Sequence, residues 1–124
     1  MLINLSNHPF EDWDEKQKQT AMSAYGVVED LPFPEVDPAA DTQVVAQLAA
    51  DYLNKCILKF GNTFCDTDSI HISGEPCFLF HFVTLSKVHG IPCISSTTRR
   101  LVTNEANIKT AIFHFVQFRN YYQK

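Results

Sequence analysis

The sequence lacks most of the short motifs that reveal a cofactor or a metal. It contains only four glycines, and it has neither a Gly-x-Gly-x-x-Gly fingerprint nor a Gly-x-x-x-x-Gly-Lys-Ser/Thr loop. An ordinary dinucleotide-binding dehydrogenase and a P-loop ATPase are therefore excluded. None of the four cysteines belongs to a Cys-x-x-Cys pair, and no His-x-x-x-His motif is present. We therefore expect no metal site, no cofactor, and free, partly buried thiols.

Long hydrophobic runs and an excess of basic charge are also absent. No apolar run approaches the roughly twenty residues that span a bilayer. Residues 1–5 are apolar but have no basic region and end at Ser6, so we expect no secretory signal, no membrane contact and a cytoplasmic protein. Fourteen acidic and ten basic residues give a net charge of -4, which argues against binding of long nucleic acid but permits a small local basic site.

What the sequence does contain is the patterning of one α/β domain over residues 1–124. Hydrophobic residues make up 45% of the chain, enough for one core of ordinary size. Apolar runs predict strands at residues 2–5, 27–31, 69–73 and 91–95, and spacings of three and four predict helices from residue 15 to a stop at Gly26, at 44–60 and at 77–89. This alternation predicts a Rossmann-like three-layer sandwich with a mostly parallel sheet.

The end of the chain predicts an antiparallel β-hairpin. Residues 100–103 and 110–118 are two extended runs joined by residues 104–107. In the second run, alternation places Ile112, His114, Val116 and Phe118 on one face and the intervening residues on the other. Both faces are apolar enough that we expect them to be covered, and residues 113–118 are expected in the core or a dimer interface.

The carboxyl ends of parallel strands are where such sheets bind ligands. That edge gathers four loops, at residues 6–9, 32–34, 73–75 and 96–99. In the first of them, His8 beside Ser6 and Asn7 could move a proton or hold a phosphate, or it could simply order the loop. The other histidines fall within strands or on apolar helices, where a core or surface role is expected.

Two further loops offer groups that suit a phosphate. Gly74 opens a helix whose free backbone N–H groups could seat a phosphate oxygen, although Gly74 could equally serve a tight turn while Glu75 favours the helix dipole. Thr97 and Thr98 precede Arg99 and Arg100, and hydroxyls next to a guanidinium suit a phosphodiester.

The same stretch has a simpler interpretation, in which the threonines are only strand formers and the arginines are solvated. Phe33 or the aromatic tail could add a stacking face for a base.

The opening segment Asn4-Leu5-Ser6-Asn7-His8-Pro9, together with the alternation and small size, resembles a known family. It is similar to the stand-alone CRISPR-associated Rossmann-like proteins related to CARF domains, which are ring nucleases and binders of cyclic oligoadenylate. Ser6, His8 and Pro9 match the strand-end motif of that family, whereas Asn7 is an added residue.

The resemblance implies a homodimer whose twofold axis lies over the strand ends, acting as an off-switch in CRISPR antiviral signalling. It implies metal-independent cleavage, in which a ribose 2′-hydroxyl attacks the adjacent phosphorus and leaves a 2′,3′-cyclic phosphate. Ser6 and His8 would contact the phosphate or the 2′-hydroxyl, with His8 as acid or base. The residues themselves add Asn7, Gly74, Glu75, Thr97, Thr98 and Arg99 as candidate ligand contacts. A module that sequesters the nucleotide without cleaving it, and an α/β interaction domain without a nucleotide, remain as alternatives.

Overall fold

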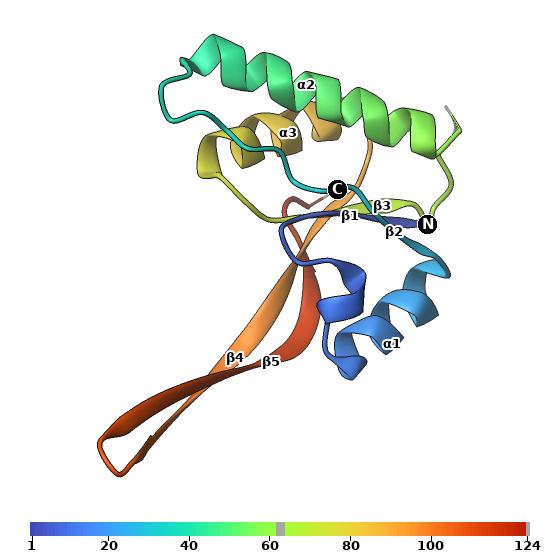
Figure 1. Cartoon of the computed structure of the whole chain (residues 1–124). Coiled ribbons are helices and arrows are strands. Elements are labelled where there is room, and N and C mark those ends of the chain that lie inside the picture. Colours follow the sequence, from blue (N-terminus) through green and yellow to red (C-terminus); the bar gives the residue numbers. More distant parts are fainter. Residues whose placement is uncertain (62–63, 124) are drawn as a thin grey trace.

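The computed structural model describes residues 1–61 and 64–123. Its elements run along the chain in the order β1 (Leu2–Leu5), η1 (Phe10–Asp12), α1 (Glu15–Tyr25), β2 (Val28–Asp30), α2 (Thr42–Lys59), β3 (Ser69–Ile72), α3 (Pro76–Val88), β4 (Cys93–Glu105) and β5 (Ile108–Asn120). Figure 1 shows α2 and α3 on one side of the sheet and α1 on the other. Among the described helices, none is long and apolar enough to cross a membrane.

The five strands form one sheet in the order β2-β1-β3-β4-β5. β1, β2, β3 and β4 are parallel to one another, and β5 pairs with β4 in the antiparallel sense. The predicted α/β, Rossmann-like arrangement with an antiparallel C-terminal hairpin is confirmed. The direction of strand addition reverses between β1 and β3, so this is the switch point at which such sheets bind ligands.

An acidic residue caps the N-terminus of α1, of α2 and of α3. Asp14 accepts a hydrogen bond from Gln17 N at the start of α1, and Asp41 accepts one from Val44 N at the start of α2. Glu75 accepts from Cys77 N and Phe78 N at the start of α3. A carboxylate at this position satisfies free N–H groups and faces the positive end of the helix dipole, which explains why the helices begin there.

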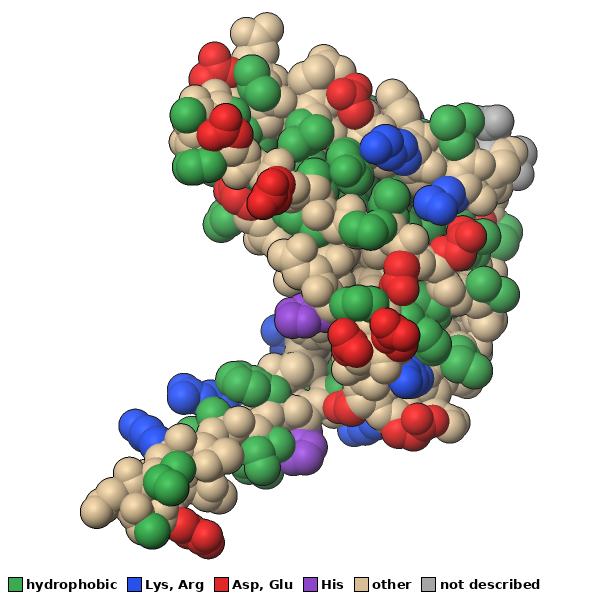
Figure 2. All heavy atoms as spheres, viewed as in Figure 1, with side chains coloured by type: hydrophobic (Ala, Val, Ile, Leu, Met, Phe, Trp, Pro, Cys, Tyr) green, Lys and Arg blue, Asp and Glu red, His purple; other side chains and the backbone are tan. Residues whose placement is uncertain are grey.

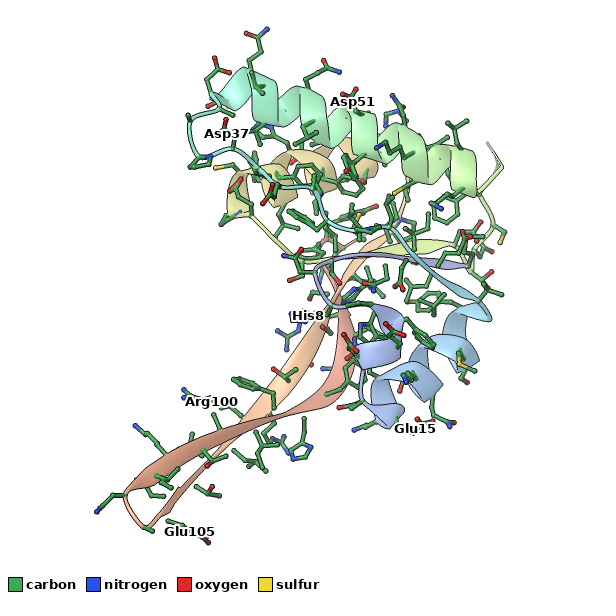
Figure 3. The ribbon with its side chains drawn as sticks, in the orientation of Figure 1. His8, Glu15, Asp37, Asp51, Arg100 and Glu105 are labelled. Atoms are coloured by element: carbon green, nitrogen blue, oxygen red, sulfur yellow. The ribbon has the colours of Figure 1, made fainter. Side chains whose placement is uncertain are left out.

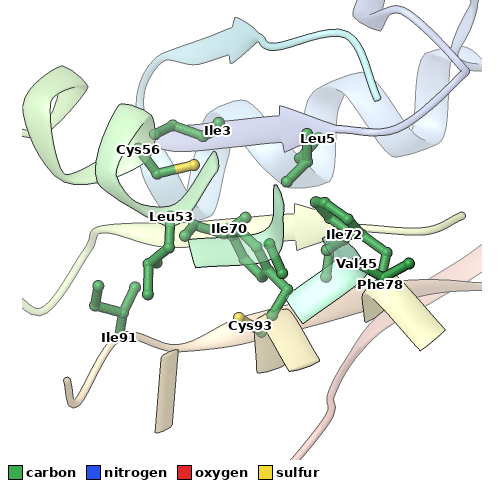
Figure 4. Close-up of a cluster of buried hydrophobic side chains, with 12 residues drawn as sticks. Ile3, Leu5, Val45, Leu53, Cys56, Ile70, Ile72, Phe78, Ile91 and Cys93 are labelled. Atoms are coloured by element: carbon green, nitrogen blue, oxygen red, sulfur yellow. The ribbon is translucent and has the colours of Figure 1, made fainter. Parts of the chain in front are cut away.

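The main core lies between the sheet and the pair α2–α3. Ile3 and Leu5 of β1 and Ile70 and Ile72 of β3 point towards the two helices and are fully buried, as Figure 4 shows. The intervening residues of these strands point to the opposite face, where Leu2 packs with Trp13 and Ala21 in a smaller cluster under α1. On that face the centre of the sheet also carries two buried polar residues, Asn4 and His71.

The C-terminal hairpin departs from expectation. The predicted fourth strand and the first run of the hairpin are one continuous strand, Cys93–Glu105, which turns at Ala106 and Asn107, both with positive φ. Only Cys93 and Ile94 of β4 pair with β3, so the rest of the hairpin projects beyond the body (Figure 1). The prediction that both faces are covered is wrong here, because Ile112 is 47% and Phe113 60% exposed. We call residues 99–114 the arm.

A β-bulge changes which residues of β5 share a face. Thr97 pairs with Gln117 but Thr98 pairs with Phe115, so Val116 is an extra residue without a partner in the ladder. Phe113 and Phe115 line a cavity on the α1 side of the sheet, and Phe118 contacts Trp13 on the same side. The predicted strict alternation is wrong at this point, because the bulge shifts the pattern by one residue.

Gly74 is required by packing, which generates a first prediction. A methyl group on Gly74 would overlap the ring of Phe33, which packs edge-on against Phe78 with 4.8 Å between ring centroids. We expect Gly74→Ala to lower the free energy of unfolding by about 1–3 kcal/mol, measured by urea denaturation. In a Phe33→Ala background the same substitution should cost much less, and equal costs in both backgrounds would contradict this explanation.

Candidate functional site

A cavity of about 560 Å³ opens at the carboxyl ends of β1 and β3 and the first half of β4, beside the switch point. Figure 2 shows the hollow between the body and the arm, and Figure 3 places His8 at its edge. Residues from η1, α1, β3, β4, β5 and their loops line it: His8, Asp12, Trp13, Asp14, Gln17, His71, Ser73, Ser96, Thr98, Phe113 and Phe115. The sheet, the start of α1 and the base of the arm thus form its walls.

The floor of the cavity is organised by the side chain of Asn4. Its amide nitrogen donates to the backbone oxygen of His8 at 2.8 Å and to Oδ1 of Asp30 at 2.9 Å. Its amide oxygen accepts from Ser6 Oγ at 2.8 Å and lies 2.9 Å from Nδ1 of His71. Because the nitrogen already donates to two acceptors, the orientation of the amide is fixed, and the oxygen can only accept.

This orientation determines the state of His71. Nδ1 must carry a proton to donate to Asn4, so in the neutral imidazole Nε2 is an acceptor with a free lone pair. Nε2 is buried and has no hydrogen-bond partner among the described residues, while His71 is only 3% exposed and lines the cavity. Burial, with a smaller effect of nearby His8, lowers the pKa of His71 from 6.5 to about 4. His71 is therefore a neutral acceptor at pH 7.

Aromatic rings hold the imidazole of His71 in place. The centroid of the Trp13 ring lies 5.1 Å from the centroid of the imidazole, and that of the Phe118 ring lies 5.8 Å from it. Both rings meet the imidazole edge to face. Trp13 also donates from Nε1 to the backbone oxygen of His8 at 3.0 Å. The backbone oxygen of His8 thus receives hydrogen bonds from Asn4, Ser6 and Trp13, which fixes the loop after β1.

Asp14 joins the start of α1 to β5 next to the base of the arm. One of its carboxylate oxygens accepts from Gln17 N at 2.8 Å and the other from Phe115 N at 3.1 Å. The hydrogen bond from Gln17, reinforced by the one from Phe115 and opposed by partial desolvation, lowers the pKa of this carboxyl below its ordinary value. A single side chain thereby sets the distance between two walls of the cavity.

The structure brings some of the predicted site residues to this cavity. The side chains of His8 and Thr98 line it. Ser6 is buried and its hydroxyl is used by Asn4 and the backbone of His8, so it supports the loop. Asn7 lies with Ser6, Pro9, Asp30 and Pro32 around a separate hollow.

The other predicted residues lie elsewhere. Thr97 is hydrogen-bonded to the backbone of Gln117 on the opposite face of the hairpin. Arg99 is also on that face, because the next residue, Arg100, pairs with the cavity-lining Phe113 and its guanidinium lies 6.0 Å from the Phe113 ring. Arg100 is therefore the arginine on the cavity side.

The start of α3 is already occupied by its own carboxylate. Glu75 accepts from Cys77 N at 2.8 Å and Phe78 N at 3.0 Å, and these bonds lower the pKa of its carboxyl. A phosphate would have to displace Glu75 to use these donors. Glu75 lies at another hollow, with Asp41 and Val45, and Gly74 accommodates the ring of Phe33.

Sequence reasoning assigned His71 to a core or surface role and missed its position in the cavity. A signal was available, because Asn4 and His71 are the polar residues in the middle of two apolar strands. They are register partners in adjacent strands, which becomes evident only once β1 is known to pair with β3. Ser73 and Ser96 belong to loops predicted at the ligand-binding edge, and Phe113 belongs to the aromatic tail considered as a stacking face, whereas Trp13 had no such signal. Among the described residues, no cluster of three or more histidine, cysteine or acidic side chains could hold a metal ion.

Comparison with known proteins matches the chain to a protein family. The model of the family described as "Uncharacterized protein MJ1673 family" matches residues 1–119. No curated protein and no solved structure matches the chain.

The role of Asn4 generates a second prediction. Asn4→Ala leaves the buried Nδ1 of His71 without its acceptor and frees Asp30 and the loop after β1. We expect the free energy of unfolding in urea to fall by about 2–4 kcal/mol. Gln47→Ala is the matched control, because it also removes an amide hydrogen bond, to Asp51, but on the exposed surface of α2. It should cost less than about 0.5 kcal/mol. Similar losses in the two variants would contradict a special role of Asn4.

The lowered pKa of His71 generates a third prediction. Between pH 6.5 and pH 4 the unfolded chain binds a proton on His71 that the folded protein excludes, so stability falls as the pH falls through this window. Above pH 6.5 the imidazole is neutral in both states and has no effect. The full loss amounts to about 3 kcal/mol. Urea unfolding of the wild type and of His71→Gln at pH 7 and pH 4.5 measures it, and the same pH dependence in both proteins would refute it.

Proposed function

The chain belongs to the Uncharacterized protein MJ1673 family, and we propose that it binds cyclic oligoadenylate in the cavity at the strand ends and cleaves it without a metal. The observation that carries this proposal is the unpartnered Nε2 of His71 at the cavity. A buried acceptor without a partner carries a desolvation cost that a ligand hydroxyl or N–H would remove. A ribose 2′-hydroxyl is such a donor.

The same geometry suits the cleavage reaction. His71 Nε2 takes the proton of the 2′-hydroxyl as the 2′-oxygen attacks the adjacent phosphorus, and the bond from phosphorus to the 5′-oxygen breaks. The products are a 2′,3′-cyclic phosphate and a 5′-hydroxyl, whose oxygen receives a proton from His8 or from water. His8 is in place for this step because its side chain lines the same cavity.

Other side chains of the cavity suit the rest of a nucleotide. The hydroxyls of Ser73, Ser96 and Thr98 line the wall and can donate to phosphate oxygens. Arg100 offers a cation beside Phe113, whose exposed ring is available for stacking on a base. These groups support a ligand that combines a phosphodiester, a sugar hydroxyl and a base.

One observation favours the alternative of binding without cleavage. With a pKa of about 4, His71 is a weak base at pH 7, although a bound phosphate anion would raise its basicity. Slow turnover or none is therefore consistent with this site, and the protein would then sequester the nucleotide. Either activity would serve to end a cyclic oligoadenylate signal in CRISPR antiviral defence, in a homodimer that places two copies of the cavity around one symmetric ring.

A fourth prediction tests the proposal. Purified protein is incubated in EDTA with labelled cyclic tri-, tetra- and hexa-adenylate, with complexes read on a native gel and products on a denaturing gel. We expect one ring size to bind and to yield linear products that end in a cyclic phosphate. His71→Gln should retain binding and lower turnover about 100-fold or more. His8→Ala should lower turnover less, because water can replace it as the acid.

His89→Gln is the matched control, because His89 is exposed at the end of α3, outside the residues that line the cavity. It should leave binding and turnover unchanged. Binding without products would support the sequestering alternative. If a folded protein neither binds nor cleaves any of the rings, the nucleotide proposal is wrong and the interaction domain remains. Equal turnover in the wild type and in His71→Gln would remove His71 from the reaction.

A further inference from the structure

One face of the arm continues the wall of the cavity, and we call it the inner face. It contains Phe113, which lines the cavity, and the register of β4 and β5 assigns every other residue of the arm to this face or to the opposite one. Within residues 99–114, all of which the structure describes, the inner face consists of Arg100, Val102, Asn104, Lys109, Ala111 and Phe113.

The charges of the arm are divided unequally between its faces. The inner face carries two cations, Arg100 and Lys109, and no acid among residues 99–114. The opposite face carries Arg99 and the acid Glu105, so its charges offset each other. Figure 3 shows Arg100 and Glu105 on opposite sides of the arm. The inner face is therefore complementary to an anion, whereas the opposite face is not.

Both cations of the inner face are free to meet a ligand. Arg100 and Lys109 are exposed, and neither belongs to an ion pair found in residues 1–61 and 64–123. The guanidinium of Arg100 lies 6.0 Å from the centre of the Phe113 ring, and this ring is 60% exposed. A cation beside an exposed ring suits a phosphate joined to a base, because arginine binds phosphate oxygens and bases stack on aromatic side chains.

The spacing of the two cations indicates a ligand with more than one phosphate. Arg100 pairs with Phe113 and Asn104 pairs with Lys109, so the cations lie four residues apart along the hairpin. At roughly 3.3 Å a residue, this separation is about 13 Å. A phosphate bound at Arg100 does not also reach Lys109, and the second cation is placed for another phosphate of the same ligand.

The acids nearest to this surface lie in another wall of the cavity. Asp12 ends η1 and Asp14 caps α1, and both oxygens of Asp14 already accept hydrogen bonds from backbone N–H groups. Negative charge on that wall favours an orientation in which phosphates lie against the arm. The unpartnered Nε2 of His71 belongs to the same cavity, so a ligand on the inner face continues towards it.

We propose that the inner face of the arm binds a single-stranded oligonucleotide, with phosphates at Arg100 and Lys109 and a base on Phe113. The inference rests on the proposed function, because it extends the same site from the nucleotide at His71 to the units that follow it. It names oligonucleotides of several units, in preference to mononucleotides, as the ligand class. The three arm residues hold the ligand and contact none of the reacting atoms.

The test measures binding of fluorescently labelled deoxyadenylates of one, two, four and six units by anisotropy in EDTA. These linear chains have no 2′-hydroxyl, so they are not cleaved and bind without the proposed contact to His71. We expect the six-unit chain to bind about tenfold or more tightly than the single nucleotide, because contacts on one chain reinforce each other. Circular dichroism checks that each variant is folded.

Neighbouring residues on the two faces of the arm supply matched controls. Arg100→Ala and Lys109→Ala should each weaken binding of the six-unit chain about fivefold or more. Each should also make the plot of log affinity against log salt shallower by about 0.7, the change for one lost phosphate contact. Phe113→Ala should weaken binding about fivefold or more through the loss of one stacked base. Arg99→Ala and Ile112→Ala remove similar side chains from the opposite face and should leave the affinity and the slope unchanged.

Several results would overturn the inference. The folded wild type does not bind the six-unit chain, or binds it no better than the single nucleotide. Alternatively, Arg99→Ala weakens binding as much as Arg100→Ala does, which would assign binding to the charge of the arm as a whole.

The proposed function fails separately from the inference. If the wild type binds the six-unit chain through Arg100 and Lys109 but neither binds nor cleaves any cyclic oligoadenylate, the ring proposal alone is wrong. If the rings bind equally well to the wild type, to Arg100→Ala and to Lys109→Ala, the inference about the arm alone is wrong.

Discussion

The amide of Asn4 is the constraint on which the candidate site depends. It lies in the middle of the sheet, where a polar group is tolerated only if its hydrogen bonds are made, and it makes four. Through them it connects β1 with β3, with the end of β2 and with the loop that carries His8. A buried apolar residue at this position could make none of these hydrogen bonds, so it would leave the orientation of His71 and of the loop undetermined.

The cavity exists because of this polar centre and because the helices cover the two faces of the sheet unequally. On one face α2 and α3 bury a continuous apolar layer. On the other face the shorter α1 buries only a small cluster. The N-cap residue of this helix, Asp14, accepts a hydrogen bond from the backbone N–H of Phe115 in β5. The space between the strand ends and the arm therefore stays open, with His71 at its base.

The sequence was sufficient to predict the fold but not the site. Short β-branched runs such as residues 69–73, amphipathic spacing, and caps such as Asp14 and Asp41 act locally, so the strands and helices could be predicted from neighbouring residues. His71 could not be placed in this way, because its significance depends on the strand order that sets it beside Asn4. The same holds for Arg99 and Arg100, whose faces are decided by the pairing of β4 with β5.

The bulge at Val116 shows a further limit of prediction from sequence. This single unpaired residue places Phe118 on the same face as Phe115, and no residue type or spacing in the sequence indicates it. The length of the arm was missed for a related reason. Hydroxyl-bearing and arginine residues between 95 and 100 interrupt the apolar pattern, although the backbone continues as one strand through them.

The cavity combines an unsatisfied acceptor with acidic side chains. Nε2 of His71 has no hydrogen-bond partner among the described residues, and Asp12 and Asp14 line the same cavity. In the proposed function the nucleotide supplies the donor, but its phosphate adds to the negative charge beside Asp12 and Asp14. Arg100 lies on the cavity side of the arm, beside the ring of Phe113, and is the cation placed to offset this charge. The affinity for an anionic ligand therefore depends on Arg100 as well as on the acceptor of His71.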